Sequence, residues 1–245
     1  MRNPGKILPF LHKGLHGIRT LLYPSHCGAC GIRVEVSSGE ELLCQPCREK
    51  ILRPSGHLCP ICSHPVSELA LCSNCEGRDW HLKFIVAACR YEGLVRELIQ
   101  RFKYGRDLSL VRLLGELMLP AMEDPRFDGK KFDAIVPVPL HPMREREREF
   151  NQAALLALRL GGHLGIPVLQ LLSRNRVTKP QAGFDRNHRL ENLKGAFSVR
   201  RGVKQGAVLL LVDDVSTTGT TLDLCAAVLL DAGAGEVCAV TVARG

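Results

Sequence analysis

The stretch that decides the fold of this chain is Val208-Leu-Leu-Leu-Val-Asp213-Asp214-Val215-Ser216-Thr217-Thr218-Gly219-Thr220-Thr221. It begins as a wholly apolar run, which is typical of a strand buried on both faces, and this run ends in two adjacent carboxylates. A hydroxyl-rich turn with one glycine follows, and helical spacing runs from Thr220 to Leu230. The stretch therefore predicts a buried strand, a tight turn and a helix, in that order.

The turn has the chemistry of an anion-binding site. Backbone N–H groups and hydroxyls from Ser216 to Thr220 would surround the positive end of the following helix. Gly219 would let the backbone approach an anion closely. The carboxylates of Asp213 and Asp214 would repel a phosphate but suit the hydroxyls of a sugar beside it. A helix cap alone would explain one hydroxyl and neither carboxylate, so we predict a site for a ribose 5-phosphate.

Outward from this stretch, strand and helix patterns alternate from Trp80 onward. Apolar or β-branched runs predict strands at 84–89, 134–138, 168–172, 208–212 and 237–242, and helical spacing predicts helices at 94–102, 108–122, 152–164 and 220–230. This alternation predicts an α/β fold with a mostly parallel twisted sheet flanked by helices. Sheets of this kind bind ligands at the carboxyl ends of their strands.

The cysteines indicate a second kind of site. Of 11 cysteines, eight form C-x-x-C pairs within one short segment, namely Cys27/Cys30, Cys44/Cys47, Cys59/Cys62 and Cys72/Cys75. Two such pairs complete a tetrahedral set of four thiolates for zinc. A disulfide framework would require an exported protein, and redox C-x-x-C motifs occur singly. We therefore predict one or two structural zinc ions, each contributing on the order of 10–16 kcal/mol to folding.

The spacing leaves the pairing of these cysteines open. Sequential pairing, our first choice, groups the first four cysteines in one site and the last four in another. A cross-braced arrangement, first pair with third and second with fourth, fits the spacing too. His57 and His64 lie nearby but are not needed as ligands.

Composition sets broader bounds. The chain has 245 residues, is 45% hydrophobic and carries a formal net charge of +8, which excludes global disorder and favours either anionic partners or simply a soluble basic surface. No apolar run is long enough to span a bilayer. The pattern of residues 1–23 predicts an amphipathic helix packed on the protein. Contact with a membrane surface is the alternative. No export signal is visible, so we expect a cytoplasmic protein.

The segment Asp213–Thr221 resembles the phosphoribosyl pyrophosphate signature of type I phosphoribosyltransferases. The whole chain resembles the ComF family of competence-associated proteins, through the cysteine pairs, this signature and several shorter motifs. These motifs are Tyr91 with Lys103-Tyr104, Val136-Pro-Val-Pro139, Phe150-Asn-Gln152, and Gln181 with Arg189, Asn192 and Gly195-Ala-Phe197. The resemblance implies a domain of type I phosphoribosyltransferase fold at 81–245, after a double zinc ribbon at 24–80.

The resemblance also implies roles for particular residues. Asp213 and Asp214 would hold the ribose hydroxyls, and the 5-phosphate would be held by Ser216, Thr217, Thr218, Gly219 and Thr220. Lys103, and Arg106 beside it, would meet the pyrophosphate. Arg176 and Arg189 would lie on a basic loop that closes over the ligand. Mg²⁺ would accompany phosphoribosyl pyrophosphate.

Two functions follow from the resemblance. The first is a Mg²⁺-dependent phosphoribosyltransferase whose acceptor is unknown. The second is a non-catalytic protein of DNA uptake that binds single-stranded DNA or a competence helicase and uses the fold as a scaffold. One residue departs from the family pattern: Glu149 stands where the family usually has glycine, in Arg148-Glu149-Phe150-Asn151-Gln152. This puts the backbone geometry of that loop in question.

Overall fold

The computed structural model describes residues 26–34, 42–68, 70–175 and 195–245. The chain divides into two compact units, Met1–Ile51 and Leu52–Gly245. The predicted helix at 1–23 lies outside the described residues, and the predicted domain boundaries at 23/24 and 80/81 stay predictions. The larger unit contains the second half of the cysteine-rich segment together with the α/β domain.

In the smaller unit, the described structure is organised around four cysteines. Residues His26 and Arg33 form an isolated antiparallel bridge, which turns the chain through the first C-x-x-C pair. The second pair brackets the start of helix α2, Gln45–Glu49, with Cys44 as its N-cap. Pro46 stands in the first turn of α2, where the missing N–H group would have no partner in the helix.

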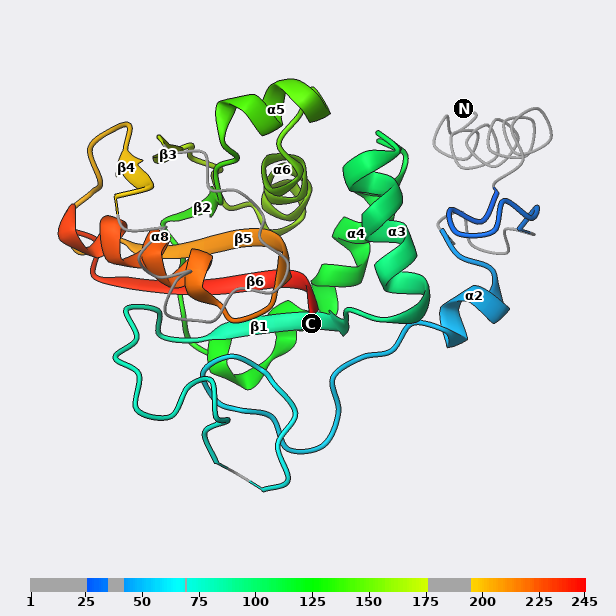
Figure 1. Ribbon diagram of the computed structural model, residues 1–245, viewed down its shortest axis with the longest axis horizontal. Coiled ribbons are helices and arrows are strands. Elements are labelled where there is room, and N and C mark those ends of the chain that lie inside the picture. The colour runs from blue at the N-terminus through cyan, green and yellow to red at the C-terminus, as the bar shows by residue number, and fades with distance from the viewer. Residues whose placement is uncertain (1–25, 35–41, 69, 176–194) are drawn as a thin grey trace, which may run out of the picture. The chain divides into compact units, whose positions relative to one another are not determined.

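The larger unit is built on a parallel sheet. Its strands are β1 (Ile85–Arg90), β2 (Ala134–Pro137), β5 (Val208–Ser216) and β6 (Glu236–Arg244), in the spatial order β1-β6-β5-β2. All three strand pairs are parallel (Figure 1). The predicted α/β class is therefore confirmed, and the carboxyl ends of the four strands meet at one edge.

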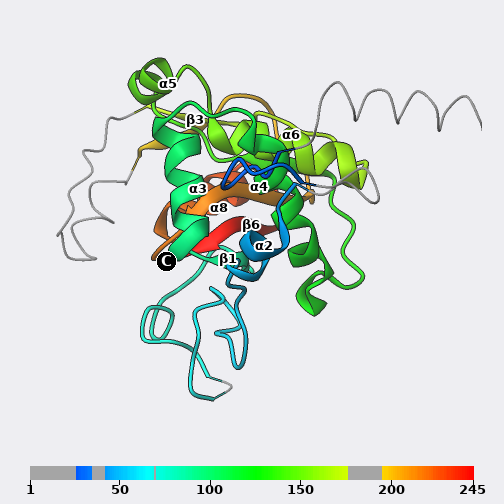
Figure 2. The ribbon, with the colours of Figure 1, turned by 90° about the vertical axis from the view of Figure 1, so that its right-hand side faces the viewer.

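Helices cover both faces of this sheet. Those that pack on the strands are α4 (Leu110–Met118), α6 (Gln152–Leu164) and α8 (Thr220–Asp231). Helix α3 (Gly93–Tyr104) packs on α4, and α5 (Pro142–Arg148) has no buried residue. Side chains alternate between faces along each strand, so Leu209 and Leu211 of β5 pack with α8, whereas α6 and α4 pack on the opposite face. Figure 2 shows α4 and α6 beside β5 and β6 from a second direction.

The cysteines of the second group belong to this core. Cys59, Cys62, Cys72 and Cys75 are all buried and form one hydrophobic cluster with α8 and with the sheet residues that face α8. The segment 52–84 that carries them has no helix or strand among its described residues. It consists of turns, and its position depends on side-chain contacts with the domain.

Three predictions about elements need correction. The helix predicted at 108–122 ends at Met118 and continues as a 3-10 turn, Leu119–Glu123, because Pro120 has no N–H group for helical bonding. The strand predicted at 168–172 is reduced to a bridge between Val168 and Ile135. The chain then leaves the sheet and forms an antiparallel hairpin of β3 (Leu172–Arg174) with β4 (Phe197–Val199). Helix α5 was not predicted, because the mixed charges at 144–149 gave no indication of a helix.

Candidate functional site

Opposite charges meet at the carboxyl end of β5. The Lys103 ammonium nitrogen lies 2.7 Å from Asp214 Oδ1, and the side chains are 17% and 8% exposed. Burial opposes the charge of Lys103, but the carboxylates of Asp214 and Asp213 outweigh it and raise the lysine pKa. Lys103 therefore stays a cation beside the two predicted ribose-binding residues.

Asp213 retains its proton to a higher pH than an ordinary aspartate. Burial and the adjacent charge of Asp214 raise the pKa of Asp213 to about 7, against the opposing charges of Lys103 and Arg174. One oxygen of Asp213 accepts a hydrogen bond from the Asp214 N–H group at 2.8 Å. Near neutral pH this carboxyl can therefore donate as well as accept a hydrogen bond, which suits a sugar hydroxyl.

The predicted anion-binding turn follows at once. Ser216 is 3% exposed, and its hydroxyl has no hydrogen-bond partner among the described residues. The hydroxyls of Thr218 and Thr220 lie 2.9 Å apart. Gly219 is the N-cap of α8 with φ of 73°, a left-handed conformation that favours glycine. We call Ser216–Thr220 the phosphate loop. A buried polar group without a partner is costly in a protein interior, so the Ser216 hydroxyl favours a bound ligand here.

Gly219 is required for a second reason. A Cβ atom at this position would lie 2.8 Å from Trp80 Cη2 and 2.8 Å from Ile85 Cδ1. The indole of Trp80 therefore supports the phosphate loop from behind. The sequence alone left this single tryptophan without a role.

Arg174 joins the site although it was not among the predicted residues. Its guanidinium carbon lies 5.3 Å from the centre of the Phe197 ring, and burial lowers its pKa, against the charges of Cys225 and Asp213. The clue in the sequence was that Arg174 is the first basic residue of the stretch 173–197.

The other three predicted basic residues have different outcomes. Arg106 is turned toward α5, where it contacts Glu149 at 2.7 Å and donates to the Glu147 carbonyl at 2.9 Å. Arg176 and Arg189 lie outside the described residues. Lys103 is thus the predicted basic residue that the structure brings beside Asp213 and Asp214.

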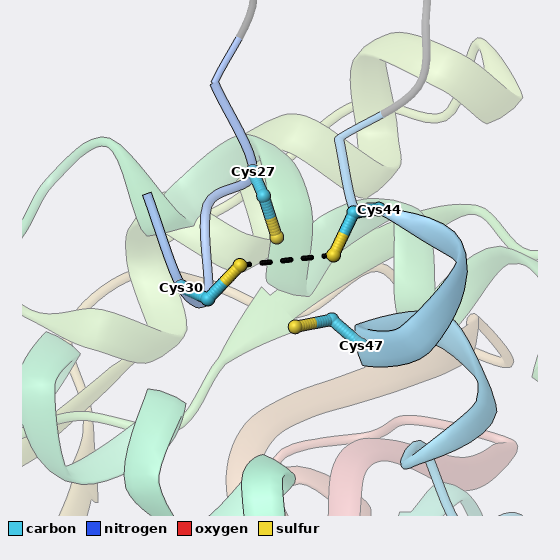
Figure 3. Close-up of side chains that lie close together, drawn as sticks. All are labelled: Cys27, Cys30, Cys44 and Cys47. Carbon is cyan, nitrogen blue, oxygen red and sulfur yellow. Dashed lines mark hydrogen bonds between the residues drawn. The ribbon is translucent and has the colours of Figure 1, made fainter. Parts of the chain in front are cut away.

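Each group of four cysteines offers a compact set of thiols. The ligand atoms of Cys27, Cys30, Cys44 and Cys47 lie within 4.8 Å of one another, and the same holds for Cys59, Cys62, Cys72 and Cys75. Figure 3 shows the first four sulfurs converging on one point, with Cys30 and Cys44 Sγ atoms 3.7 Å apart. Four convergent thiols fit a tetrahedral zinc ion. Sequential pairing is therefore the one in the structure, and two structural zinc sites are consistent with it.

One thiol in each group ionises readily. Burial raises the pKa of Cys27, but backbone N–H groups of Cys30, Cys44 and Ala29 outweigh it and lower the value to about 6. In the same way, backbone groups that include those of Cys72 and Cys62 overcome burial and lower the pKa of Cys59 to about 7. Backbone donors thus favour the thiolate that zinc requires.

The fold and the cysteine groups together define a zinc-ribbon protein with an α/β domain. The model of the double zinc ribbon domain matches residues 18–76. Competence protein ComFC of Bacillus subtilis is 30% identical over 84% of this chain and 85% of its own length. Competence protein F of Haemophilus influenzae is 34% identical over 80% and 87%, and DNA utilization protein YhgH of Escherichia coli K12 is 32% identical over 89% and 96%. The chain belongs to the ComF family of competence and DNA-utilization proteins.

Solved structures with some likeness to the chain include phosphoribosyl enzymes. An allosteric regulatory enzyme of purine biosynthesis is 25% identical, with a TM-score of 0.37 over 55% of this chain and 25% of that one. An adenine phosphoribosyltransferase is 15% identical, with a TM-score of 0.36 over 58% of this chain and 74% of that one. Separately, none of the helices in the described part of the chain has the length and apolarity to cross a membrane.

Proposed function

We propose that this protein binds Mg²⁺-phosphoribosyl pyrophosphate at the carboxyl end of β5 and transfers its phosphoribosyl group to an acceptor that is still to be identified. The observation that carries the proposal is the placement of Asp213 and Asp214 just before the phosphate loop, with Lys103 of α3 paired to Asp214. In that loop the buried Ser216 hydroxyl has no partner among the described residues. No simple structural role accounts for all of these groups at one strand end.

In the proposed complex, the two carboxyl groups hold the ribose hydroxyls. The phosphate loop donates backbone N–H groups and hydroxyls to the 5-phosphate, aided by the positive end of α8. Lys103 is already charged and partly buried, so it can face the pyrophosphate without a change in protonation. Arg176 and Arg189 are proposed to act on the same group.

In the transfer step, the C1–O bond to pyrophosphate breaks and the pyrophosphate leaves with the bonding electrons. The nucleophilic atom of the acceptor bonds to C1 and gives up its proton. Mg²⁺ carried with the pyrophosphate would supply positive charge where negative charge develops. Lys103 contributes in the same sense, because a preformed cation requires no reorganisation during the reaction.

A second candidate is a non-catalytic role in DNA uptake. The names of the three relatives, a ComFC, a competence protein F and a DNA utilization protein, support it, as does the net charge of +8. In this role single-stranded DNA or a competence helicase would be the partner, in the cytoplasm. Binding to DNA would fall steeply with salt, because it would release counterions.

Calorimetric titration of the zinc-loaded full chain with phosphoribosyl pyrophosphate and Mg²⁺ tests the first candidate. We expect saturable binding that Asp213→Asn/Asp214→Asn reduces by at least about tenfold, the effect of losing one hydrogen bond to a charged group. Asp133→Asn is a matched control, since Asp133 accepts from Val208 at the opposite end of β5. Saturable binding would justify a search for acceptors by pyrophosphate release.

Absence of binding to the wild-type protein would reject the enzymatic proposal. The DNA-uptake role would then be tested with single-stranded DNA at several salt concentrations. Affinity that falls steeply with salt and is equal in the wild type and the double variant would support a scaffold role.

A further inference from the structure

One buried arginine joins the second cysteine group to the phosphate loop. Arg244, the last residue of β6, is 6% exposed. Its Nε donates to the Cys62 carbonyl at 3.2 Å, and its Nη2 lies 3.8 Å from Cys62 Sγ. Its Nη1 donates to the Ser216 carbonyl at 3.3 Å. A single guanidinium therefore contacts both a predicted zinc ligand and the first residue of the phosphate loop.

A second connection reaches the other side of the loop. Arg78 follows Cys75 closely in the chain, and its N–H group donates to the Cys75 carbonyl at 3.3 Å. Its Nη1 donates to the Thr218 carbonyl at 3.3 Å, and its guanidinium lies 3.7 Å from the centre of the Trp80 ring. The same Trp80 lies behind Gly219. Both sides of the phosphate loop are thus held by residues next to the second cysteine group.

Asp223 fixes this second connection to helix α8. It is 4% exposed and pairs with Arg78 at 3.0 Å. It also accepts from the N–H groups of His81 and Leu82, at 2.8 and 3.1 Å. A buried carboxylate with this many donors is a rigid anchor. The chain after Cys75 is therefore attached to the helix whose N-terminus forms the phosphate loop.

Metal binding decides whether this support exists. The segment 52–84 has no helix or strand among its described residues, so four converging thiolates add to the few turn and bridge hydrogen bonds that hold its backbone. In such segments the free energy of zinc binding is also free energy of folding. Loss of the ion would free Cys62 and Cys75, which Arg244 and Arg78 contact on the side away from the phosphate loop.

We propose that the second cysteine group, Cys59/Cys62/Cys72/Cys75, is a metal-dependent support of the phosphate loop, with Arg244 as its positioning residue. Zinc in this group, and not in the first, then determines how well ordered the loop is and how tightly it binds a ribose phosphate. The affinity part rests on the proposed function. The part that concerns loop order does not, because it follows from contacts in the ligand-free protein. By linkage, a bound ligand must in turn raise the affinity of this group for zinc by the same factor.

Hydrogen exchange of the full chain without ligand tests the loop order. The variants are Arg244→Gln, which keeps all eight cysteines, Cys72→Ser in the second group and Cys30→Ser in the first. Zinc content is measured on each. We expect exchange of a peptide spanning 213–222 to be about tenfold faster in Arg244→Gln and Cys72→Ser than in the wild type. Cys30→Ser should lose one zinc ion and leave this peptide unchanged.

Arg53→Gln is a control for the loss of an arginine that bridges two carbonyls, with Arg53 exposed where Arg244 is buried. Arg53 donates to the carbonyls of Ala88 and Leu117, in the same unit but with no contact to the loop. A general loss of stability would accelerate exchange in both arginine variants. A specific support predicts faster exchange of 213–222 in Arg244→Gln alone, with two zinc ions retained.

Calorimetry and titration of zinc against a chelator complete the test. If phosphoribosyl pyrophosphate binds, Arg244→Gln should weaken its binding about tenfold and abolish the rise in zinc affinity that the ligand causes. If it does not bind the wild type while exchange still responds to Arg244→Gln, the proposed function fails and the support stands. Unchanged exchange of 213–222 in a folded, zinc-loaded Arg244→Gln overturns the inference, whatever the ligand does.

Discussion

The two cysteine groups have the same C-x-x-C motifs and different surroundings. In the first, Cys30 is exposed and Cys44 is half-buried. In the second, all four cysteines are buried and belong to the core of the α/β domain. The first group can serve the smaller unit alone, whereas the second also serves the domain against which it packs.

Local chemistry does not explain this difference. Each group contains one thiol whose pKa is lowered, Cys27 to about 6 and Cys59 to about 7, and in both cases backbone N–H groups overcome burial. The arrangement of backbone donors around the sulfurs is thus repeated in the two groups. Tertiary contacts distinguish them, chiefly those of Cys62 with Arg244. A motif predicts a metal site, but the role of the site depends on its neighbours.

Substitution of two glycines tests this comparison and has the largest expected effect on stability. Gly31 beside the first group and Gly219 in the phosphate loop have nearly equal φ, 74° and 73°. A Cβ at Gly31 would meet nothing within 4 Å, whereas one at Gly219 would clash with Trp80 and Ile85. Gly31→Ala should therefore cost about 1 kcal/mol of backbone strain. Gly219→Ala should cost about 3 kcal/mol, because overpacking adds to the strain.

Calorimetry of the full chain measures both changes. Gly219→Ala should lower the Tm of the main transition by about 5–10 °C, and Gly31→Ala should leave that transition nearly unchanged because it lies in the smaller unit. An equal fall in the two variants would show that the groups do not differ as described.

The sequence predicted the parts of this picture that are local. The apolar run before Asp213 and the hydroxyls around Gly219 specify a strand, a turn and a helix, and β5 and α8 are present. The C-x-x-C spacing specifies metal sites in the same way. Helix Gln152–Leu164 matches its prediction at both ends, because Asn151 caps it and Gly165 ends it in a left-handed conformation.

The parts that the sequence did not predict depend on long-range contacts. Arg244 is near Cys62 only because β6 lies beside β1 and the cysteine segment packs at that edge. Arg106 was predicted to face pyrophosphate, but Glu149 is its partner, 43 positions away. No periodicity records such pairs. They arise when the sheet brings distant segments together.

A change of pH distinguishes the two regions in a second way. Low pH protonates thiol ligands in both groups, but Asp213 lies only in the larger unit. Its folded pKa is about 7, against about 3.9 in an unfolded chain. Between these values the folded state holds a proton that the unfolded state has lost, so stability falls as pH rises toward 7. Above pH 7 this contribution no longer changes.

Asp213→Asn should remove this slope. With zinc in the buffer, the free energy of unfolding from urea titrations at pH 5.5 to 8 should fall by on the order of 2 kcal/mol more in the wild type than in the variant. The Asp133→Asn protein controls for the loss of any carboxylate near β5. Parallel pH profiles for wild type and Asp213→Asn would contradict the raised pKa of Asp213.

Glu149 allows the cost of a positive φ to be measured separately from packing. Its substitution has the smallest expected effect on stability. It has φ of 69° without being glycine, at the end of α5 and far in sequence from both cysteine groups. Glycine, which the family resemblance leads one to expect here, would relieve about 1 kcal/mol of left-handed strain. It would also remove the exposed ion pair with Arg106, which contributes about 0.2–1 kcal/mol. Glu149→Gly should therefore raise stability by less than about 1 kcal/mol.

Glu149→Gln separates the two contributions, because it removes the ion pair and keeps the strained backbone. It should lower stability by about 0.5 kcal/mol, so the two variants should differ by about 1 kcal/mol in urea titrations. That difference is the cost of a positive φ alone in this domain. Any excess cost of Gly219→Ala over it then measures the contact of the phosphate loop with Trp80 and Ile85. A Gly219→Ala cost no larger than this baseline would mean that the tryptophan does not support the loop.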